Sequence, residues 1–293
     1  MRSLLLAALL ASCYHDTTPT LANGVGGGST DPLAYLPIDS EFVLGADVQA
    51  LRASAMWKRF EPRIRAEMGH DYDEVRAACG FDPAETMTYF AIGLRFTDED
   101  HPSGVAVVRG MPAKALECVA TRFGKGGEAT RDRGTVVLHE GRTNLAWTMV
   151  GDTLLLHIDP AAGHDSLERI VASGAPLHDS PAFMALYDHL DHHAAVFGAG
   201  NGASQALRFL GTIRPMTVSG TMAISDRLDW ITHVKMPTAG AAKVARDELQ
   251  NDIDKAKPFV NTLDMTGKDD AFDVHVVVDS DKLDALMTLA RIK

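Results

Sequence analysis

The chain has 293 residues, of which 46% are hydrophobic and 23% charged, a balance typical of a globular protein and not of a disordered one. Its formal net charge of −11 repels phosphate backbones and anionic lipid headgroups, which argues against nucleic-acid binding. The length allows one large domain or two of ordinary size.

The N-terminal segment MRSLLLAALLASC has the order of a secretory signal. Arg2 supplies a positive charge, an apolar run extends over Leu4–Leu10, and small residues precede Cys13. The run is far shorter than the roughly 20 residues that a bilayer-spanning helix needs. Residues 10–13 resemble the lipobox of bacterial lipoproteins, in which the cysteine is lipidated and becomes the mature first residue. The sequence therefore predicts a signal peptide at residues 1–12 and lipidation at Cys13; the alternative is an ordinary secreted protein with a cysteine there.

Residues 13–31 are rich in Gly, Thr, Asn and Asp and show no apolar period. We expect a flexible tether between the lipid and the folded body. Cleavage before Cys13 removes Arg2 and no acidic residue, so the net charge changes from −11 to −12. No second apolar run is long enough to span a bilayer, so the only membrane attachment predicted is the lipid on Cys13.

The elements expected between residues 32 and 175 alternate between helices and short strands. Asp47 is placed to cap a helix after the strand 42–45, and Asp82 is placed to cap another. Gly80 suits the left-handed position that ends a helix. Gly151-Asp152 between two apolar runs predicts a two-residue hairpin turn. The other expected elements are strands at 87–96, 104–108, 135–140, 144–150 and 153–158 and helices at 111–123 and 166–172.

Residues 176–293 repeat this order in their pattern, so the chain is interpreted as a duplication. The segment 42–46 (FVLGA) is echoed by 195–199 (AVFGA), and each is followed by a short Ala-Leu-Arg helix start. A strand pair, a helix with an apolar stripe at Ala245, Leu249, Ile253 and Ala256, a strand at 272–278 and a final helix follow. The alternative is chance similarity between two stretches of this class. The sequence predicts an α+β fold of two related units, 32–175 and 176–293, each a mainly antiparallel sheet with helices packed on one face.

Two cysteines remain after Cys13, namely Cys79 and Cys118. In an oxidising envelope an even pair is a disulfide candidate, and the alternative is two separate buried thiols. We expect the bridge, which would close a long loop and stabilise the fold.

Residues 198–203 hold the pattern G-x-G-x-x-A after an expected strand, the outline of a dinucleotide-binding turn. The helix expected after it is short, and no parallel crossover follows. We therefore interpret these glycines as a tight strand-to-helix turn and predict no nucleotide cofactor.

The densest group of metal-ligand types is the segment 188–193, DHLDHH. His189 and either His192 or His193 would share one face of a helix. A zinc site needs three or four ligands with supporting partners, and the sequence identifies no others. The alternative is a solvated helix end. No cofactor is predicted, and zinc at His189, His192 and His193 stays open as the alternative.

Motifs for nucleophilic catalysis are missing from the sequence. It contains no G-x-S-x-G and no serine followed three residues later by lysine. His139 and His157 lie at expected strand ends, where an acid–base role is conceivable but a sheet-surface histidine is commoner. No catalytic residue is predicted.

The stretches YLPIDSEFVLGADVQALRAS, CGFDPAETM and VVRGMP occur between Leu33 and Pro112. In them the chain resembles a class of uncharacterised predicted lipoproteins from myxobacteria and related Gram-negative bacteria. The shared motifs mark the places where strands end and helices begin, so the resemblance implies an α+β envelope protein and no known activity or site.

The expected function is that of a non-enzymatic outer-membrane lipoprotein on the periplasmic or surface face. It would bind an envelope protein or another envelope ligand through an exposed sheet face or between its two halves. The alternative is a metal-dependent hydrolase that uses His189, His192 and His193.

Overall fold

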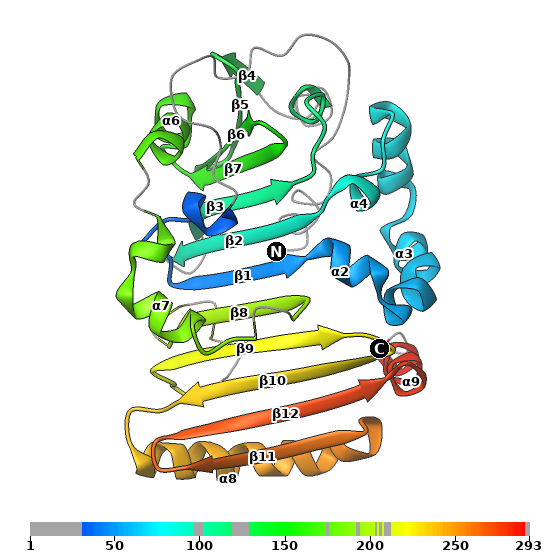
Figure 1. Ribbon diagram of the computed structural model, residues 1–293, viewed down its shortest axis with the longest axis vertical. Helices are drawn as coiled ribbons and strands as arrows, with labels where there is room; N and C mark the ends of the chain where they lie inside the picture. Colours follow the sequence, from blue (N-terminus) through cyan, green and yellow to red (C-terminus); the bar gives the residue numbers. More distant parts are fainter. Residues whose placement is uncertain are drawn as a thin grey trace. The chain divides into compact units, whose positions relative to one another are not determined.

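The computed structural model describes residues 31–96, 102–118, 129–173, 176–191, 194–202, 204, 207 and 212–290 (Figure 1). The chain forms two compact units. The first comprises the described part of Met1–Ser40 and Arg63–Pro181, and the second comprises Glu41–Pro62 and the described part of Ala182–Lys293. This differs from a division at residue 175, because strand β1 (Phe42–Asp47) pairs with β8 (Val196–Asn201) and so joins the second unit.

The first unit contains an antiparallel sheet in the order β2-β3-β7-β6-β5-β4. The predicted meander is confirmed, and its Gly151 has a φ of 62° in the two-residue turn between β6 and β7. The short β4 was not predicted. The strands are β2 (Tyr89–Phe96), β3 (Pro102–Arg109), β4 (Ala129–Asp132), β5 (Thr135–Glu140), β6 (Thr143–Val150) and β7 (Thr153–Asp159).

Helix α6 (His164–Ser173) packs against β5, β6 and β7 of this sheet. Helix α3 (Ala55–Cys79) ends at Gly80, whose φ of 67° confirms the predicted left-handed position. Asp82 caps α4 (Pro83–Thr86) by accepting a hydrogen bond from the Ala84 amide, as predicted. The remaining short helices of this unit are η1 (Pro32–Tyr35) and η2 (Leu177–Asp179), and α7 (Pro181–Tyr187) follows at the start of the second unit's later segment.

The second unit contains an antiparallel sheet in the order β1-β8-β9-β10-β12-β11. Asp47 caps α2 (Val48–Ala53), as predicted, through the Ala50 amide. The other elements are β9 (Thr217–Ile224), β10 (Arg227–Lys235), α8 (Ala239–Ala256), η4 (Lys257–Phe259), β11 (Thr262–Lys268), β12 (Ala271–Asp279) and α9 (Ser280–Ala290).

The two units repeat one topology. Each has an antiparallel hairpin, β2–β3 in the first and β9–β10 in the second. A later hairpin follows, β6–β7 or β11–β12, and its last strand pairs with the second strand of the earlier hairpin. A helix, α6 or α9, comes next. The α+β class with two related, mainly antiparallel units is therefore confirmed.

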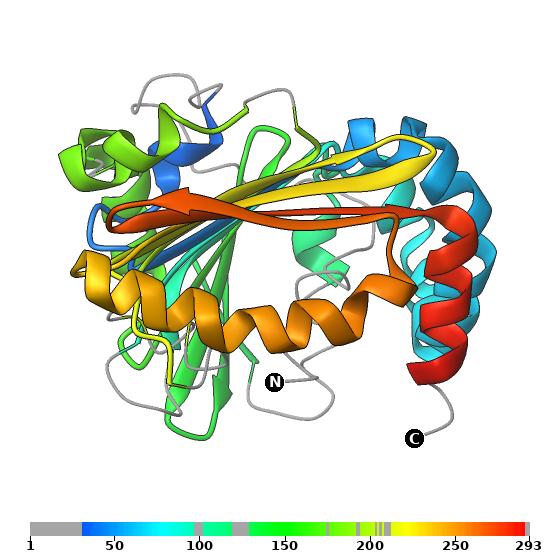
Figure 2. The same cartoon turned by 90° about the horizontal axis from the view of Figure 1, so that it is seen from below.

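Each sheet has its core where a helix covers it. In the second unit α8 runs along the sheet (Figure 2), and its buried Ala242 and Ala245 join Val234 and Phe272 in one apolar cluster. The predicted stripe along α8 is confirmed, since Ile253 is also buried. In the first unit β7 is buried on both faces, because Leu154, Leu155 and Leu156 are all inaccessible to solvent or nearly so.

Candidate functional site

A continuous row of apolar side chains crosses the second unit's sheet at right angles to its strands. Residues directly opposite each other in antiparallel strands project from the same face of a sheet. Trp230 on β10 lies opposite Met222 on β9 and Val276 on β12. The pairing continues through the neighbouring strands to both edges. The Trp230 row consists of Ala46, Val196, Met222, Trp230, Val276 and Leu263.

The Trp230 row shares its sheet face with α8 but lies beyond the part that α8 covers. Alternation along β10 places Trp230 and Val234 on one face, and Val234 is buried in the cluster with α8. Trp230, in contrast, retains 50% of its accessible surface. Its neighbours in the row are all partly exposed. The sheet therefore presents an apolar strip with a half-exposed indole near its centre.

Glycines occupy two positions beside the Trp230 row. Gly198 on β8 and Gly220 on β9 lie opposite each other, one pleat away from Val196 and Met222 on the same face. Both lie inside paired strands, so the expected tight strand-to-helix turn at Gly198 and Gly200 is wrong. β8 carries the G-x-G segment as a strand between β1 and β9, because both partners supply its backbone hydrogen bonds. Because glycine has no side chain, the surface of the sheet is recessed at Gly198 and Gly220, next to the Trp230 row.

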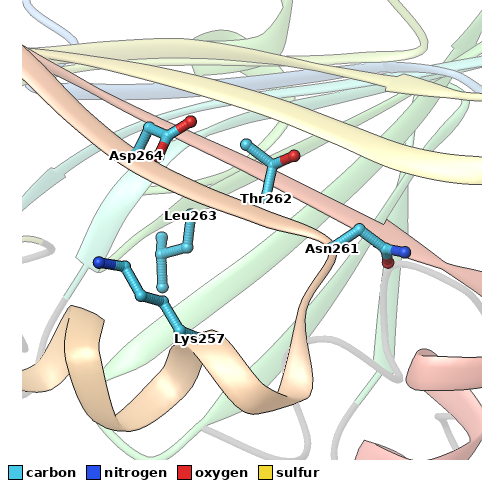
Figure 3. Close-up of a pocket in the computed structure, with 5 residues that line it drawn as sticks. All are labelled: Lys257, Asn261, Thr262, Leu263 and Asp264. Atoms are coloured by element: carbon cyan, nitrogen blue, oxygen red, sulfur yellow. The ribbon is translucent and has the colours of Figure 1, made fainter.

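A pocket of about 350 Å³ adjoins one end of the Trp230 row. It is lined by Lys257 of η4, Asn261, and Thr262, Leu263 and Asp264 of β11 (Figure 3). Leu263 points toward the helix that carries Lys257, whereas Thr262 and Asp264 point to the other side of the strand. Leu263 therefore belongs both to the Trp230 row and to the wall of this pocket.

The opposite face of the same strands is polar and holds two imidazole–carboxylate pairs. His233 Nδ1 lies 2.7 Å from Asp273 Oδ1, and His275 Nε2 lies 2.8 Å from Asp229 Oδ1. All four side chains are between 31% and 49% exposed. Ile231, which is 47% exposed, lies on the same face.

This polar face contains the residue types of a hydrolytic triad without its contacts. Ser219, His233 and Asp273 lie opposite one another on β9, β10 and β12. A triad needs the nucleophile to hydrogen-bond to the base. Among the interactions of the described residues, no hydrogen bond joins Ser219 to His233. Ser219, His233 and Asp273 therefore support no catalytic assignment.

The structure places few of the predicted site residues. Cys79 and Cys118 form the predicted disulfide, which joins the end of α3 to the segment after β3. His189 is exposed in the turn that follows α7. Cys13, His192 and His193 lie outside the described residues, so lipidation and the zinc cluster stay predictions.

The two strand-end histidines have structural partners. His139 Nδ1 lies 2.7 Å from Asn144 Oδ1, and His157 Nδ1 lies 2.8 Å from Ser166 Oγ. Ser166 also donates to the Gly163 carbonyl and accepts from its amide. Ser166 thus closes the turn before α6, and its hydroxyl proton is already engaged.

The sequence did not identify the Trp230 row. The segment 227–235 reads RLDWITHVK, in which apolar residues do not alternate strictly with polar ones. β11, TLDMTGK, is mostly polar, and the sequence predicted no strand there. The row depends on cross-strand register, and the tryptophan in an otherwise mixed strand was the only local signal.

Comparison with known proteins shows the fold and no family. No family model matches the chain, and no curated protein matches it. Two solved structures of a protein named TP0453 are similar to it. Crystal form III superposes with a TM-score of 0.57 at 10% identity, covering 88% of this chain and 98% of the other. Crystal form I gives a TM-score of 0.52, also at 10% identity, covering 88% and 97%.

Proposed function

We propose that this protein is a non-enzymatic cell-envelope lipoprotein whose folded part binds an envelope protein or another envelope ligand through the Trp230 row. The single observation that supports this is the half-exposed Trp230 at the centre of an apolar row that crosses the whole sheet of the second unit. Exposed contiguous apolar surface on a soluble domain marks interaction sites. Tryptophan in particular is enriched among residues that dominate binding energy.

The energy available at this surface is sufficient for a specific contact. Covering the exposed half of Trp230 removes roughly 100 Å² from water, which contributes about 2.5 kcal/mol. The flanking aliphatic side chains add smaller amounts. The polar pairs on the opposite face provide no comparable apolar area, so the Trp230 face is the better binding surface.

The ligand is expected to present an apolar group and no phosphate backbone. The net charge of −11 opposes polyanions, and the described members of the row are uncharged. Attachment through Cys13 and the tether at residues 13–31 would hold the domain near the membrane that carries its partners.

Site-specific photo-crosslinking in the native cell envelope tests this proposal. Trp230 is replaced by p-benzoylphenylalanine in one strain and Val244 in a matched control. Val244 is 57% exposed on α8 and lies outside the row. We expect one defined product, identified by mass spectrometry, at position 230 and not at 244. Equal labelling at both positions, or labelling at neither, would contradict the proposal.

A second measurement separates binding from folding. Trp230→Ala should abolish the crosslinked partner's binding to the purified domain while the domain stays folded; loss of the buried half of the indole should lower the melting temperature by only a few degrees. Val244→Ala should preserve both. Turnover of an envelope substrate by the purified protein that survives in Trp230→Ala would instead favour an enzyme.

A further inference from the structure

A cluster of ligand-type side chains lies in the first unit, far along the chain from the histidines that the sequence singled out. His164, Asp165 and Glu168 occupy the first turns of α6, and one ligand atom from each lies within 4.8 Å of the other two. The turn Arg133-Gly134, between β4 and β5, adjoins them. Its residues have φ values of 44° and 80°, which direct the Arg133 side chain to Asp165.

His164 is buried and held in one orientation. Its side chain is 4% exposed, and its Nδ1 lies 3.1 Å from the hydroxyl of Thr135, which is itself buried. Thr135 lies on β5, so the contact fixes the ring of a helix residue against the sheet. This contact uses Nδ1, so Nε2 is the ring nitrogen that can bind a ligand. In metal sites, a hydrogen bond at one ring nitrogen is what orients the other toward the ion.

The second ring nitrogen of His164 faces a carboxylate without a hydrogen bond. Nε2 lies 3.8 Å from Glu168 Oε2, beyond hydrogen-bond range. When Nδ1–H donates to Thr135, Nε2 presents a lone pair toward an anion, and these repel. Either a proton on Nε2 or a cation between the two atoms removes the repulsion. The separation of 3.8 Å is close to that of two ligands sharing one ion with bonds of about 2.0–2.2 Å.

The charges around this nitrogen favour a divalent cation. Asp132 also interacts electrostatically with His164, so three carboxylates, those of Asp132, Asp165 and Glu168, lie in this region. Two guanidinium groups lie beside them: Arg133 Nη2 is 2.8 Å from Asp165 Oδ1, and Arg169 Nε is 3.2 Å from the Asp165 backbone carbonyl. The three carboxylates outnumber the two guanidinium groups, so the local charge is negative and favours a cation. Glu168 has no contact with Arg133 among the described interactions, and Asp165 keeps its second oxygen for a ligand bond.

We propose that His164 Nε2, Asp165 and Glu168 form a binding site for a divalent transition-metal ion, with Thr135 as the positioning residue for the imidazole. The nitrogen ligand favours zinc-like ions over calcium or magnesium, which take oxygen ligands. Asp165 and Glu168 are 81% and 56% exposed, so water completes the coordination. The site is independent of the Trp230 row, and all three of its protein ligands come from the first turns of α6.

Titration of the metal-free protein with Zn²⁺ tests the site, with binding followed by calorimetry and the melting temperature measured in parallel. We expect one equivalent to bind at this cluster and raise the melting temperature. Glu168→Gln and His164→Ala should each weaken that binding at least tenfold. Thr135→Val should weaken it by roughly 10–100-fold, as loss of an orienting partner does.

Two controls separate this cluster from other histidines. His178 lies 3.5 Å from Asp31 and 3.6 Å from Asp179 but does not form a compact triplet with them, so His178→Ala should leave binding unchanged. His189→Ala tests the cluster predicted from the sequence and should also leave the binding at His164 intact. Glu168→Gln keeps the proposal testable if His164→Ala fails to fold, because Glu168 is exposed.

Several outcomes would overturn the proposal. The proposal fails if no zinc binds at micromolar concentrations and His164 gives an imidazolium signal near neutral pH. That result would mean that a proton on His164 Nε2, and not a metal ion, lies between it and Glu168. Binding that is lost in His189→Ala and kept in Glu168→Gln would place the metal at the other histidines. Co²⁺ absorption bands that need His164 and Glu168 would support the site.

Discussion

At the scale of single residues, Asp82 connects two helices through a buried polar network. Its side chain is 5% exposed and accepts hydrogen bonds from Arg65, at 2.5 Å, and from the Tyr72 hydroxyl. Burial by itself raises the pKa of Asp82, but the hydrogen bonds from Arg65 and Tyr72 outweigh it and hold the pKa below its ordinary value. Burial and the neighbouring carboxylate raise the pKa of Tyr72 well above its usual range.

Asp82→Asn is expected to lower the free energy of unfolding by about 2–4 kcal/mol, because it leaves Arg65 without its buried anion. The pKa of Asp82 is lower in the folded state than in the unfolded state. Its contribution is therefore present above about pH 4 and is lost as the pH falls through the folded value. Urea unfolding at pH 7 measures the change. The exposed Asp254→Asn serves as a control and should have little effect; equal effects of both variants would contradict the network.

His157 should make stability fall in mildly acidic solution. Burial lowers its pKa below 6.5 in the folded state. Above that pH the imidazole is neutral in both states and contributes nothing. Below it the unfolded chain takes up the proton first, so stability decreases, by at most about 1.4 kcal/mol per pH unit.

The variant His157→Asn isolates this effect, since its amide can still donate to Ser166. We expect the slope of stability between pH 7.5 and 5 to be shallower in this variant than in the wild type. His178→Asn, at a side chain that is 42% exposed, should keep the wild-type slope. An unchanged slope in His157→Asn would show that other groups carry the acid dependence.

At the scale of elements, the disulfide between Cys79 and Cys118 ties the end of α3 to the segment after β3. The two cysteines are 39 residues apart and both are buried beside Tyr72. Closing a loop of this length stabilises the fold by about 4 kcal/mol in the chain-entropy model. Cys79→Ala/Cys118→Ala should lose roughly that amount in urea unfolding. Reductant should destabilise the wild type and leave the double variant unchanged; a wild type indifferent to reductant would contradict this.

Helix caps and turns were predictable from the sequence where they depend only on residues close together in the chain. The caps at Asp47 and Asp82, the left-handed Gly80 and the turn at Gly151 each depend on a few neighbouring residues. The sequence predicted one helix after Asp47 and a separate one ending at Gly80, whereas α3 is a single long helix that continues through Pro62. The glycines of β8 were misread because a glycine-rich segment indicates a turn, unless strands on both sides supply its hydrogen bonds.

At the scale of the whole molecule, membrane attachment is predicted to depend on Cys13 alone. In the part of the chain that the structure describes, no helix is long and apolar enough to cross a membrane. Cys13→Ala should therefore move the exported protein from the membrane fraction to the soluble fraction and abolish palmitate labelling. Cys79→Ala, which spares the lipid site, is the control. A Cys13→Ala protein that still sediments with membranes and resists salt extraction would contradict the lipoprotein assignment.

The duplication also belongs to this scale, and only part of it was visible in the sequence. The echo between residues 42–46 and 195–199 identified matching strands, but not that these strands pair with each other. The fold similarity to TP0453 at 10% identity shows that very different sequences can form this topology. The β1–β8 pairing joins residues more than a hundred positions apart, so no local pattern indicates it.

The sequence by itself determined the α+β class, the meander of β5, β6 and β7, the helix caps and the preferred pairing of Cys79 with Cys118, because each follows from local propensity or from elimination among few candidates. The tertiary structure alone decided which side chains meet. The Trp230 row exists because five cross-strand registers align, and a shift of one residue in any of them would move its members to the opposite face. His164 meets Thr135 because α6 packs on β5, a contact that no local pattern encodes.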